Sequence, residues 1–383
     1  HWADHPHSVY SRCWPTYAPG HGETGQSRTV RAEGEKVSHR IRFVAGRGRM
    51  PLLRRWPNDR KAALVFVDHA DKGRSDTLRA LLYGDSTGDD KERGLLGNGL
   101  KLTRTVFDHP RQMQDPDFAA LAEALVKAGG EVAPHSITPR RETPAQIKSS
   151  LATTFATYAP RTWVDHQPDT NCEAINNTGG RRGHKNNVVE LLHDEGVRYL
   201  WEAPDPDYRG DINLLKPALP QRRAPFLYPA PRIGRSLDAE DPWLFITAWM
   251  FVPTEDLVDR LSERNLNRLQ YDHGVHLAHT YLGAVHKKAQ HKDNTIFERR
   301  RNGVLSTKAE IEALWTRLGL RSKRGELWVT TVGDLGDWLT TWDRLRLNAE
   351  GPSRVRLVHD GPAAPRVRDG FTIASRWKGR VDG

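Results

Sequence analysis

The sequence predicts an α/β fold in which alternating strands and helices form one large barrel. Apolar runs of strand length alternate with amphipathic stretches of helix length, a pattern typical of a parallel sheet. The number of these units favours a barrel over an open sheet. At 383 residues the chain also exceeds the ~250 residues that such barrels commonly occupy. We therefore expect one large core with additional segments.

The first predicted units begin after residue 60. A buried strand starts at Ala62 and runs into a polar end, and a short helix covers Ser75 to Tyr83 before a second strand at Leu100 to Phe107. A helical stripe with i, i+3, i+4 spacing then predicts an amphipathic helix that ends at Gly129 and Gly130; its apolar residues are Phe118, Leu121, Ala122, Leu125 and Val126.

Capping signals mark the next helix. Thr143 is its expected N-cap, Pro144 occupies the first helical position, and Gln146 completes a capping box. Its apolar residues are Ile147, Leu151, Phe155 and Tyr158. The remaining helices are expected at 187–195 and 254–269 and after Thr307 with Glu310, and the remaining strands at 197–203, 243–252 and 325–332.

Composition changes at both ends divide the chain into three predicted parts. Residues 1–58 are rich in His, Pro, Gly and Arg and form an N-terminal extension, residues 59–345 form the barrel, and residues 346–383 form a small β appendage. The chain contains two cysteines, Cys13 and Cys172, which we expect to pair. A single disulfide suits an exported protein, and two unrelated buried thiols are an open alternative, so the cysteines do not decide the compartment. We expect an extracellular or cell-envelope location.

The charge pattern argues against nucleic acid as the partner. The net charge is +10, yet Lys and Arg are scattered apart from short runs such as Arg299 to Arg301, whereas a nucleic-acid groove favours a basic stripe with aromatic residues between. No apolar run reaches the ~18 residues of a transmembrane helix. The chain begins at His1 without an apolar signal segment, so we expect any leader to be removed or to lie outside this chain.

Polar side chains follow several predicted strands and are the candidate site. They are Asp68, His69 and Asp71 after the first strand, His135 after residues 131–134, Asp165 and His166 after residues 161–164, and His276 and His279 in the run 274–282. Charge at the end of a buried strand is costly unless it is paired, metal-bound or catalytic. Ligands bind beyond the carboxyl ends of strands in such folds, so these groups predict a shared site that holds a divalent metal.

The order of these motifs resembles the polysaccharide deacetylases of carbohydrate esterase family 4. FVDHA at Phe66 to Ala70 stands in place of the family's TFDDG, HSITP at His135 to Pro139 in place of H-[ST]-x-x-H, and VHLAHTY supplies a late His. The resemblance covers residues 61–345. It implies a distorted (β/α) barrel of the deacetylase type and a metal-dependent hydrolase that removes N-acetyl groups from amino sugars of a polysaccharide or glycoconjugate.

The resemblance also implies residue roles. Asp68 matches the catalytic base and His279 the catalytic acid, while His69 and His135 match metal ligands. The family's second metal His would fall at Pro139, which cannot ligate. Replacement ligands are then needed, and Asp71 and His166 are the candidates, because zinc accepts mixed sets of His and carboxylate. We expect a divalent metal, with zinc the first candidate, and substrate contacts from Trp201 and Asp165.

Other interpretations of the same residues stay open. Asp68 and Asp71 could cap the following helix, His135 could be a hydrogen-bonded neighbour of the site, and Trp201 could belong to the core. The barrel could be a non-catalytic carbohydrate-binding protein, which Pro139 and His69 favour, or a glycoside hydrolase that uses Asp68 with Asp165 or Glu202. The sequence determines neither the sugar, the metal nor the oligomeric state.

Overall fold

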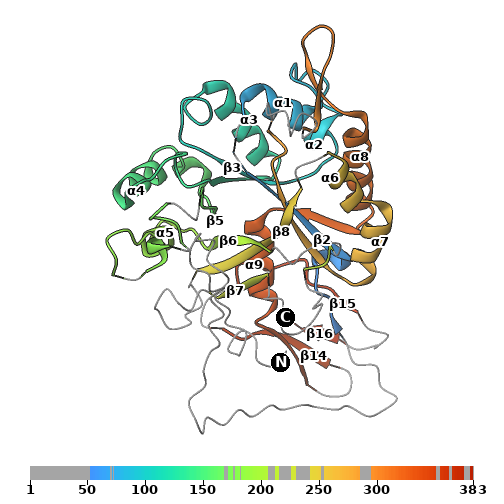
Figure 1. The fold of residues 1–383 in the computed structure, drawn as a ribbon. Helices are drawn as coiled ribbons and strands as arrows, with labels where there is room; N and C mark the ends of the chain where they lie inside the picture. The colour runs from blue at the N-terminus through green and yellow to red at the C-terminus, as the bar shows by residue number, and fades with distance from the viewer. Residues whose placement is uncertain are drawn as a thin grey trace.

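The computed structural model describes most of the chain from residue 52 onward (Figure 1). The described residues are 52–69, 71, 73–167, 171–175, 177–181, 183–205, 212–214, 226–229, 242–251, 254–284, 295–350, 354–361, 365–374 and 380–382. The greater part of the predicted N-terminal extension, with Cys13, lies outside them. The pairing of Cys13 with Cys172 therefore stays a prediction.

Seven parallel strands form the central barrel in the spatial order β4-β3-β2-β9-β8-β6-β5. A parallel bridge between His135 and Val164 connects the two outer strands β4 and β5, so that the ring closes. The strands are β2 (Ala62–Asp68), β3 (Thr103–Val106), β4 (Glu131–Pro134), β5 (Thr162–Trp163), β6 (Tyr199–Asp205), β8 (Trp243–Phe251) and β9 (Val275–Thr280). This arrangement confirms the predicted α/β barrel.

The barrel is distorted, because its strands are unequal and their registers shift. β5 has only two residues, and the pairings of β6 with β8 and of β8 with β9 each contain an irregularity. Two further strands join the sheet: β12 (Leu327–Thr330) pairs with β2 in parallel, and β7 (Leu227–Pro229) pairs with β8 in antiparallel direction. β12 pairs with Ala62–Val65 of β2, whereas β3 pairs with Val67 and Asp68.

β2 lies at the centre of the molecule and all seven of its residues are buried. A strand buried on both faces has a continuous apolar sequence rather than an alternating one, which explains why Ala62 to Val67 contains no polar residue. The run ends at Asp68 and His69, which are buried as well. The sequence therefore delivers two polar groups into the interior at the carboxyl end of this strand.

Helices cover the outside of the barrel (Figure 1). They are α1 (Ser75–Tyr83), α2 (Gly94–Gly97), α3 (Pro116–Lys127), α4 (Pro144–Ala152), α5 (Val189–Asp194), α6 (Thr254–Arg260), α7 (Glu263–Tyr271), α8 (Ala309–Lys323) and α9 (Val332–Trp342), with short 3₁₀ turns η1 (Pro57–Asp59), η2 (Ala156–Tyr158) and η3 (Thr178–Gly180). The predicted bounds of α1 are confirmed. The capping box of α4 is confirmed too, since the Thr143 side chain accepts from the backbone N–H of Gln146 and the Gln146 side chain from that of Thr143.

Three helix predictions are wrong in detail. The helix expected to carry Phe155 and Tyr158 ends at Ala152, and these two residues lie at the N-cap and the end of η2. The single helix expected at 254–269 is two helices, α6 and α7, separated at Leu261 and Ser262. The N-cap of α8 is Lys308 and not Thr307, which belongs to strand β11 and donates its hydroxyl to the backbone carbonyl of Gly84. The hydroxyl is thus used in a tertiary contact instead of a cap.

The ends of the chain form smaller sheets next to the barrel. β13 (Leu345–Ala349), β14 (Arg354–His359) and β16 (Arg380–Asp382) make a three-stranded sheet, and β1 (Leu52–Leu53) pairs with β15 (Ile373–Ala374). β10 (Phe297–Arg299) and β11 (Leu305–Thr307) form a hairpin that the sequence did not predict. The three-part division of the chain stays a prediction, although the C-terminal strands agree with a β appendage.

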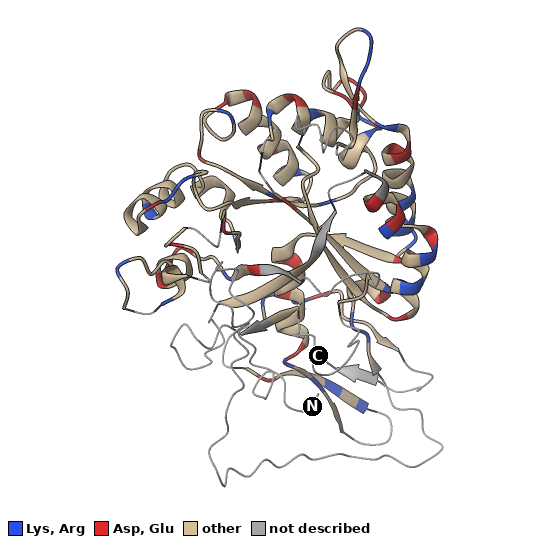
Figure 2. Cartoon of the chain, in the orientation of Figure 1, with Lys and Arg blue, Asp and Glu red and all other residues tan. Residues whose placement is uncertain are grey.

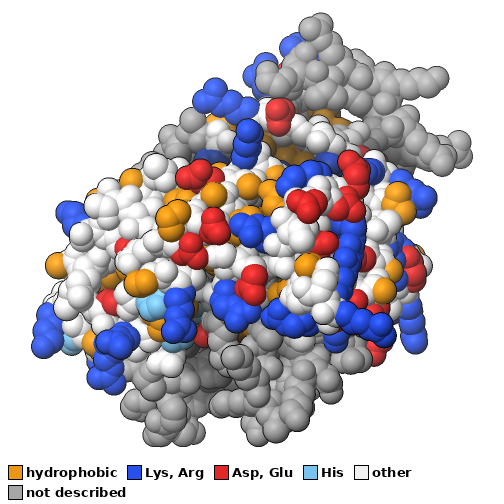
Figure 3. All heavy atoms as spheres, turned by 90° about the horizontal axis from the view of Figure 1, so that it is seen from above, with side chains coloured by type: hydrophobic (Ala, Val, Ile, Leu, Met, Phe, Trp, Pro, Cys, Tyr) orange, Lys and Arg blue, Asp and Glu red, His pale blue; other side chains and the backbone are white. Residues whose placement is uncertain are grey.

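Charged side chains of both signs are interspersed over the helices (Figure 2). The face seen in Figure 3 likewise carries Lys and Arg close to Asp and Glu. In the described ranges, no helix combines the length and the apolar character needed to cross a membrane.

Candidate metal centre

Histidines from different parts of the sequence meet at the carboxyl ends of the barrel strands. His69 directly follows β2, His135 directly follows β4, and His166 lies three residues beyond β5. Asp71 comes from the loop after β2, close to all three. Since β2, β4 and β5 belong to one parallel ring, their carboxyl ends open to the same side. Of the residues predicted to share a site, the structure therefore brings together His69, Asp71, His135 and His166.

Asp71 lies at the middle of the cluster. Its Oδ2 is 3.1 Å from Nε2 of His135, and its Oδ1 is 3.2 Å from Nε2 of His166. One potential ligand atom from each of His69, Asp71 and His135 lies within 4.8 Å of the others. Three such atoms from two imidazoles and a carboxylate are a donor set that zinc and related divalent metals accept.

Both ring nitrogens of His135 face oxygen atoms that can only accept a hydrogen bond. Its Nδ1 lies 3.2 Å from the carbonyl oxygen of Val164, and because a carbonyl can only accept, Nδ1 must carry the proton. Nε2 then faces the Asp71 carboxylate, which also only accepts. Either a second proton on His135 or a cation between the two groups satisfies this contact. A backbone-anchored Nδ1–H that leaves Nε2 for a metal is the usual arrangement of a ligating histidine.

Three further ring nitrogens in the cluster are buried and have no hydrogen-bond partner in the described part of the chain. They are Nε2 of His69, Nδ1 of His166 and Nε2 of His279. An unsatisfied buried polar group costs ~1–3 kcal/mol, so several in one place call for an explanation. A bound cation would satisfy those directed toward it. The residues present therefore fit a metal.

His69 and His279 stack face to face beside the cluster. Their ring centroids are 3.9 Å apart and their planes are 10° from parallel. The edge of Trp201 contacts both rings, with centroid distances of 5.1 Å to His69 and 5.4 Å to His279, and the Trp201 indole N–H donates to the Thr247 hydroxyl. Tyr281 lies against the same two rings. Aromatic packing thus fixes the orientation of both imidazoles.

Burial keeps these two histidines neutral. It lowers the pKa of His69 well below its ordinary value, and it lowers the pKa of His279 to about 3, with the neighbouring His135 adding to the effect. A neutral imidazole is the form that binds a metal. For Asp71, burial opposes ionisation, but hydrogen bonds from His135 and His166 outweigh it and hold its pKa far below the ordinary value. His69 and Asp71 are thus in the protonation state that ligation requires.

Asp68 lies apart from this donor set, in a buried ion pair. Its Oδ2 contacts Nη1 of Arg104, its Oδ1 accepts from the backbone N–H of Leu282 at 2.5 Å, and both side chains are fully buried. Burial raises the pKa of Asp68, while Arg104 acts in the opposite direction. Asp68 does not cap α1, whose N-cap is Arg74. Its role as the catalytic base stays a prediction.

Asp165 is turned away from the cluster. One of its oxygens accepts from the Trp163 indole N–H at 2.7 Å and the other from the backbone N–H of Ile175 at 2.8 Å. Burial raises its pKa to about 7, although the Trp163 hydrogen bond opposes this. Asp165 and Trp201 are 1% and 4% exposed, so neither presents a surface to a ligand in this structure. Their assignment to substrate binding stays a prediction.

A hydrogen bond connects the loop that carries His135 to the loop that carries His166. Ser136 has a positive φ of 47°, and its hydroxyl accepts from the backbone N–H of His166 at 3.0 Å. Glu142 accepts from the backbone N–H groups of Ile137 and Thr138, which closes the turn that contains Pro139. A left-handed conformation at a non-glycine residue costs energy and is common near functional sites. The turn therefore serves to place two of the histidines.

Sequence analysis overlooked three contributors to this region, namely Arg104, Thr247 and Tyr281. Arg104 carried a usable signal, because it is a charged residue within the predicted strand Leu100 to Phe107. Thr247 and Tyr281 had none, since a hydroxyl or a phenol near a strand end is common without a function.

Comparisons with known proteins give one structural similarity. No protein family model matches this sequence, and no curated protein matches it either. Among solved structures, the chain is similar to a variant of the peptidoglycan deacetylase PdaC from Bacillus subtilis, with 12% sequence identity and a TM-score of 0.32. The alignment covers 75% of this chain and 95% of that chain.

Proposed function

We propose that this protein is a metal-dependent hydrolase that removes N-acetyl groups from the amino sugars of a polysaccharide or glycoconjugate. The observation that carries the proposal is the donor set around Asp71, where His69, Asp71 and His135 offer ligand atoms within 4.8 Å of one another. The resemblance of the strand-end motifs to polysaccharide deacetylases supplies the reaction class and the substrate class. We further propose an extracellular or cell-envelope location.

In this proposal His69, Asp71 and His135 hold the metal and His166 supports it. His166 contacts Asp71 through Nε2, so it either joins the ligand set or orients the carboxylate. A bound divalent metal such as zinc supplies a Lewis acid for the acetyl carbonyl and lowers the pKa of a water molecule. Pro139 does not prevent this site, because Asp71 and His166 provide the donor atoms that a second motif histidine would supply.

We assign the two proton transfers of the proposed reaction to Asp68 and His279. Asp68 accepts a proton from the attacking water, and His279 gives a proton to the amine as the C–N bond breaks. Because His279 is neutral at the start, it must first receive the proton that Asp68 took from the attacking water before it can give a proton to the amine. The overall reaction consumes one water and yields acetate and a protonated amine, and both side chains return to their starting states. Arg104 would keep Asp68 ionised and oriented until it takes the proton.

The experiment that tests the proposal combines metal analysis with acetate release. We expect the purified protein to contain about one divalent ion per chain and to release acetate from at least one polymer of N-acetylated amino sugars. His135→Ala should lose both the metal and the activity. His359→Ala, in β14 outside the barrel, is the matched control and should lose neither. Protein that binds no divalent metal after incubation with zinc would overturn the proposal.

A second candidate is a non-catalytic carbohydrate-binding protein. The Asp68–Arg104 ion pair favours it, because a base that is fully buried and already paired is poorly placed to accept a proton. This candidate predicts binding of N-acetylated glycans without acetate release, even when the metal site is occupied.

A further inference from the structure

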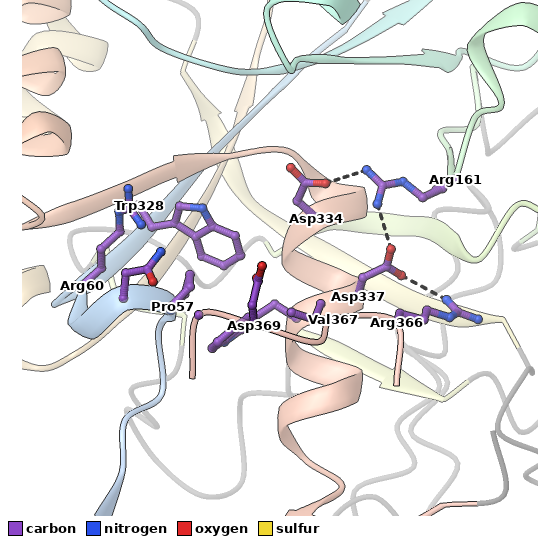
Figure 4. Close-up of a pocket in the computed structure, with 12 residues that line it drawn as sticks. Pro57, Arg60, Arg161, Trp328, Asp334, Asp337, Arg366, Val367 and Asp369 are labelled. Atoms are coloured by element: carbon purple, nitrogen blue, oxygen red, sulfur yellow. Dashed lines mark hydrogen bonds and ion pairs between the residues drawn. The ribbon is translucent and has the colours of Figure 1, made fainter. Parts of the chain in front are cut away.

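A cavity lies at the end of the barrel opposite the candidate metal centre. Its volume is about 290 Å³, and Arg60, Arg161, Trp328, Asp334, Asp337 and Asp369 are among its lining residues (Figure 4). Arg60 lies two residues before β2 and Arg161 directly precedes β5, whereas His69 and His166 follow these same strands. The cavity and the metal centre are therefore at opposite ends of the sheet, and a ligand in one does not contact the other.

One wall of the cavity is a fixed network of charges. Arg161 contacts Asp334 at 2.7 Å and Asp337 at 2.8 Å, and Arg366 contacts Asp337 at 3.1 Å. The hydroxyl of Tyr199 also donates to Asp337, at 2.6 Å. Figure 4 shows Arg161, Asp334, Asp337 and Arg366 linked along the first turns of α9. Because the two acids and the two arginines neutralise each other, this wall offers oriented polar groups without a net charge.

The opposite part of the cavity is lined by polar groups that have no hydrogen-bond partner in the described residues. The guanidinium of Arg60 lines the cavity, and in the described residues its side chain makes no hydrogen bond or ion pair. Asp369 is exposed, and in the described residues no hydrogen bond or ion pair involves it. In Figure 4 its carboxylate points into the space between Trp328 and Asp337. A free donor and a free acceptor thus face one cavity.

Trp328 supplies an apolar surface between these two parts. Its ring packs against Trp56 and Trp338 with centroid distances of 6.4 and 6.0 Å, so its position is fixed, yet it remains partly exposed in the cavity wall. An indole that is held in place on one side and open on the other is suited to a ligand with a flat apolar face.

The charged residues that line the cavity indicate which class of ligand it can bind. The lining contains three arginines and three aspartates, so the cavity attracts neither anions nor cations strongly. Arginine only donates and ionised aspartate only accepts, and a hydroxyl group does both. A ligand with several neutral hydroxyls around a ring is complementary to this set. The volume is near the lower end of the ~300–1,000 Å³ of small-molecule sites, which suits one sugar ring.

We propose that this cavity binds a neutral pyranose ring of a glycan, which packs on Trp328 and hydrogen-bonds with Arg60 and Asp369. The site is separate from the metal centre and does not rest on the proposed hydrolysis. A glycan-binding site at the far end of the barrel would hold a polymeric ligand independently of the reacting residue.

Calorimetric titration of the full chain with N-acetylglucosamine, its trimer and glucose tests the proposal. All titrations use the His135→Ala background, so that a failure of the metal-site proposal does not affect the result. We expect saturable binding of at least one sugar, weakened about tenfold or more by Asp369→Asn and by Arg60→Gln. Arg368→Gln, an exposed neighbour outside the cavity, is the control and should bind as the parent does.

Three outcomes would overturn this inference. They are the absence of saturable binding for all three sugars, binding that neither Asp369→Asn nor Arg60→Gln weakens, and displacement of the sugar by millimolar inorganic phosphate, which would identify an anion site. Trp328→Ala should also abolish binding. Because this substitution removes a packed indole, the circular dichroism spectrum of the variant is compared with that of the parent to show that the variant is folded.

Discussion

At the scale of single residues, polar groups inside or at the end of buried strands were the strongest signal in the sequence. That signal predicted His69, Asp71, His135 and His166, and the structure brings all four together. The same signal was present for Arg104, which is fully buried and is the ion-pair partner of Asp68. It was overlooked because a pairing between residues 36 positions apart cannot be inferred without knowing that β2 and β3 are neighbours.

The buried ion pair changes what substitution of Asp68 should do. If Asp68 is the general base, Asp68→Asn should lower turnover by ~100- to 10,000-fold. Asn also leaves the Arg104 charge buried without a counter-ion, and such a loss typically costs ~3–5 kcal/mol. We therefore expect this variant to lose stability as well as activity.

Arg104→Met tests the structural part of this argument. We expect a loss of ~3–5 kcal/mol in the free energy of unfolding, measured by urea denaturation, because Asp68 is left as an unpaired buried charge. Arg268→Met removes the pair with Asp272 at a largely exposed arginine and should cost no more than ~1 kcal/mol. Equal losses in the two variants would contradict the buried pair.

At the scale of elements, periodicity and capping signals were reliable where the local sequence decides the structure. The bounds of α1 and the capping box of α4 were predicted because both depend on residues within a few positions of each other. The cap of α8 was wrong because Thr307 instead bonds to Gly84, far away in sequence. The β10–β11 hairpin was missed because its strands have only three residues each, too few for an alternation to be seen.

Thr143→Ala should weaken the start of α4. The hydroxyl of Thr143 accepts from the backbone N–H of Gln146, and loss of such a cap costs about 1 kcal/mol. The free energy of unfolding measures the effect. Thr153→Ala, at an exposed position just beyond the same helix, is the control, because its hydroxyl bonds only to the carbonyl of Ser149. The cap assignment fails when the two substitutions cost the same.

The loop after β4 should make a measurable contribution to pH dependence. Burial raises the pKa of Glu142 from 4.5 to about 7, although its hydrogen bonds to Thr138 and Ile137 oppose this. The folded state then binds more protons than the unfolded state between about pH 4.5 and 7. This contribution to stability is fully present below pH 4.5 and is lost as the pH rises to about 7.

Glu142→Gln removes that contribution. As the pH rises from about 4.5 to about 7, the free energy of unfolding of the wild type should therefore fall relative to that of the variant. Taking the difference cancels the titration of the buried histidines, which has the opposite sign. Glu310→Gln, on the exposed start of α8, is the control and should show a flat difference. A flat difference for Glu142→Gln as well would refute the raised pKa.

At the scale of the whole molecule, the alternation of strands and helices was enough to predict the barrel but not its closure. The ring is closed by one bridge between His135 and Val164, and the pattern of apolar residues does not indicate which two strands meet there. Closure matters for the site because His135 and His166 follow the two strands on either side of this bridge. The weakest seam of the barrel thus lies beside the candidate metal centre.

A metal at this position would join segments that the backbone connects only weakly. Its proposed ligands follow β2 and β4, and His166 follows β5 on the other side of the seam. A ligand that binds the folded state alone stabilises it by ~2.7 kcal/mol at a hundred times its Kd and ~4.1 kcal/mol at a thousand times. We therefore expect the apparent Tm of chelator-treated protein to rise by several degrees when zinc is added.

Variants show whether the zinc-induced rise in Tm comes from the proposed metal centre or from zinc bound elsewhere on the protein. His135→Ala should lose the shift, because it removes a ligand atom, whereas His359→Ala should keep it. Magnesium, which favours oxygen ligands over imidazole, should stabilise the wild-type protein less than zinc does at the same concentration. A zinc-induced shift that is as large in His135→Ala as in wild type would place the bound metal elsewhere, and the seam between β4 and β5 would then be held by the bridge and the packed rings alone.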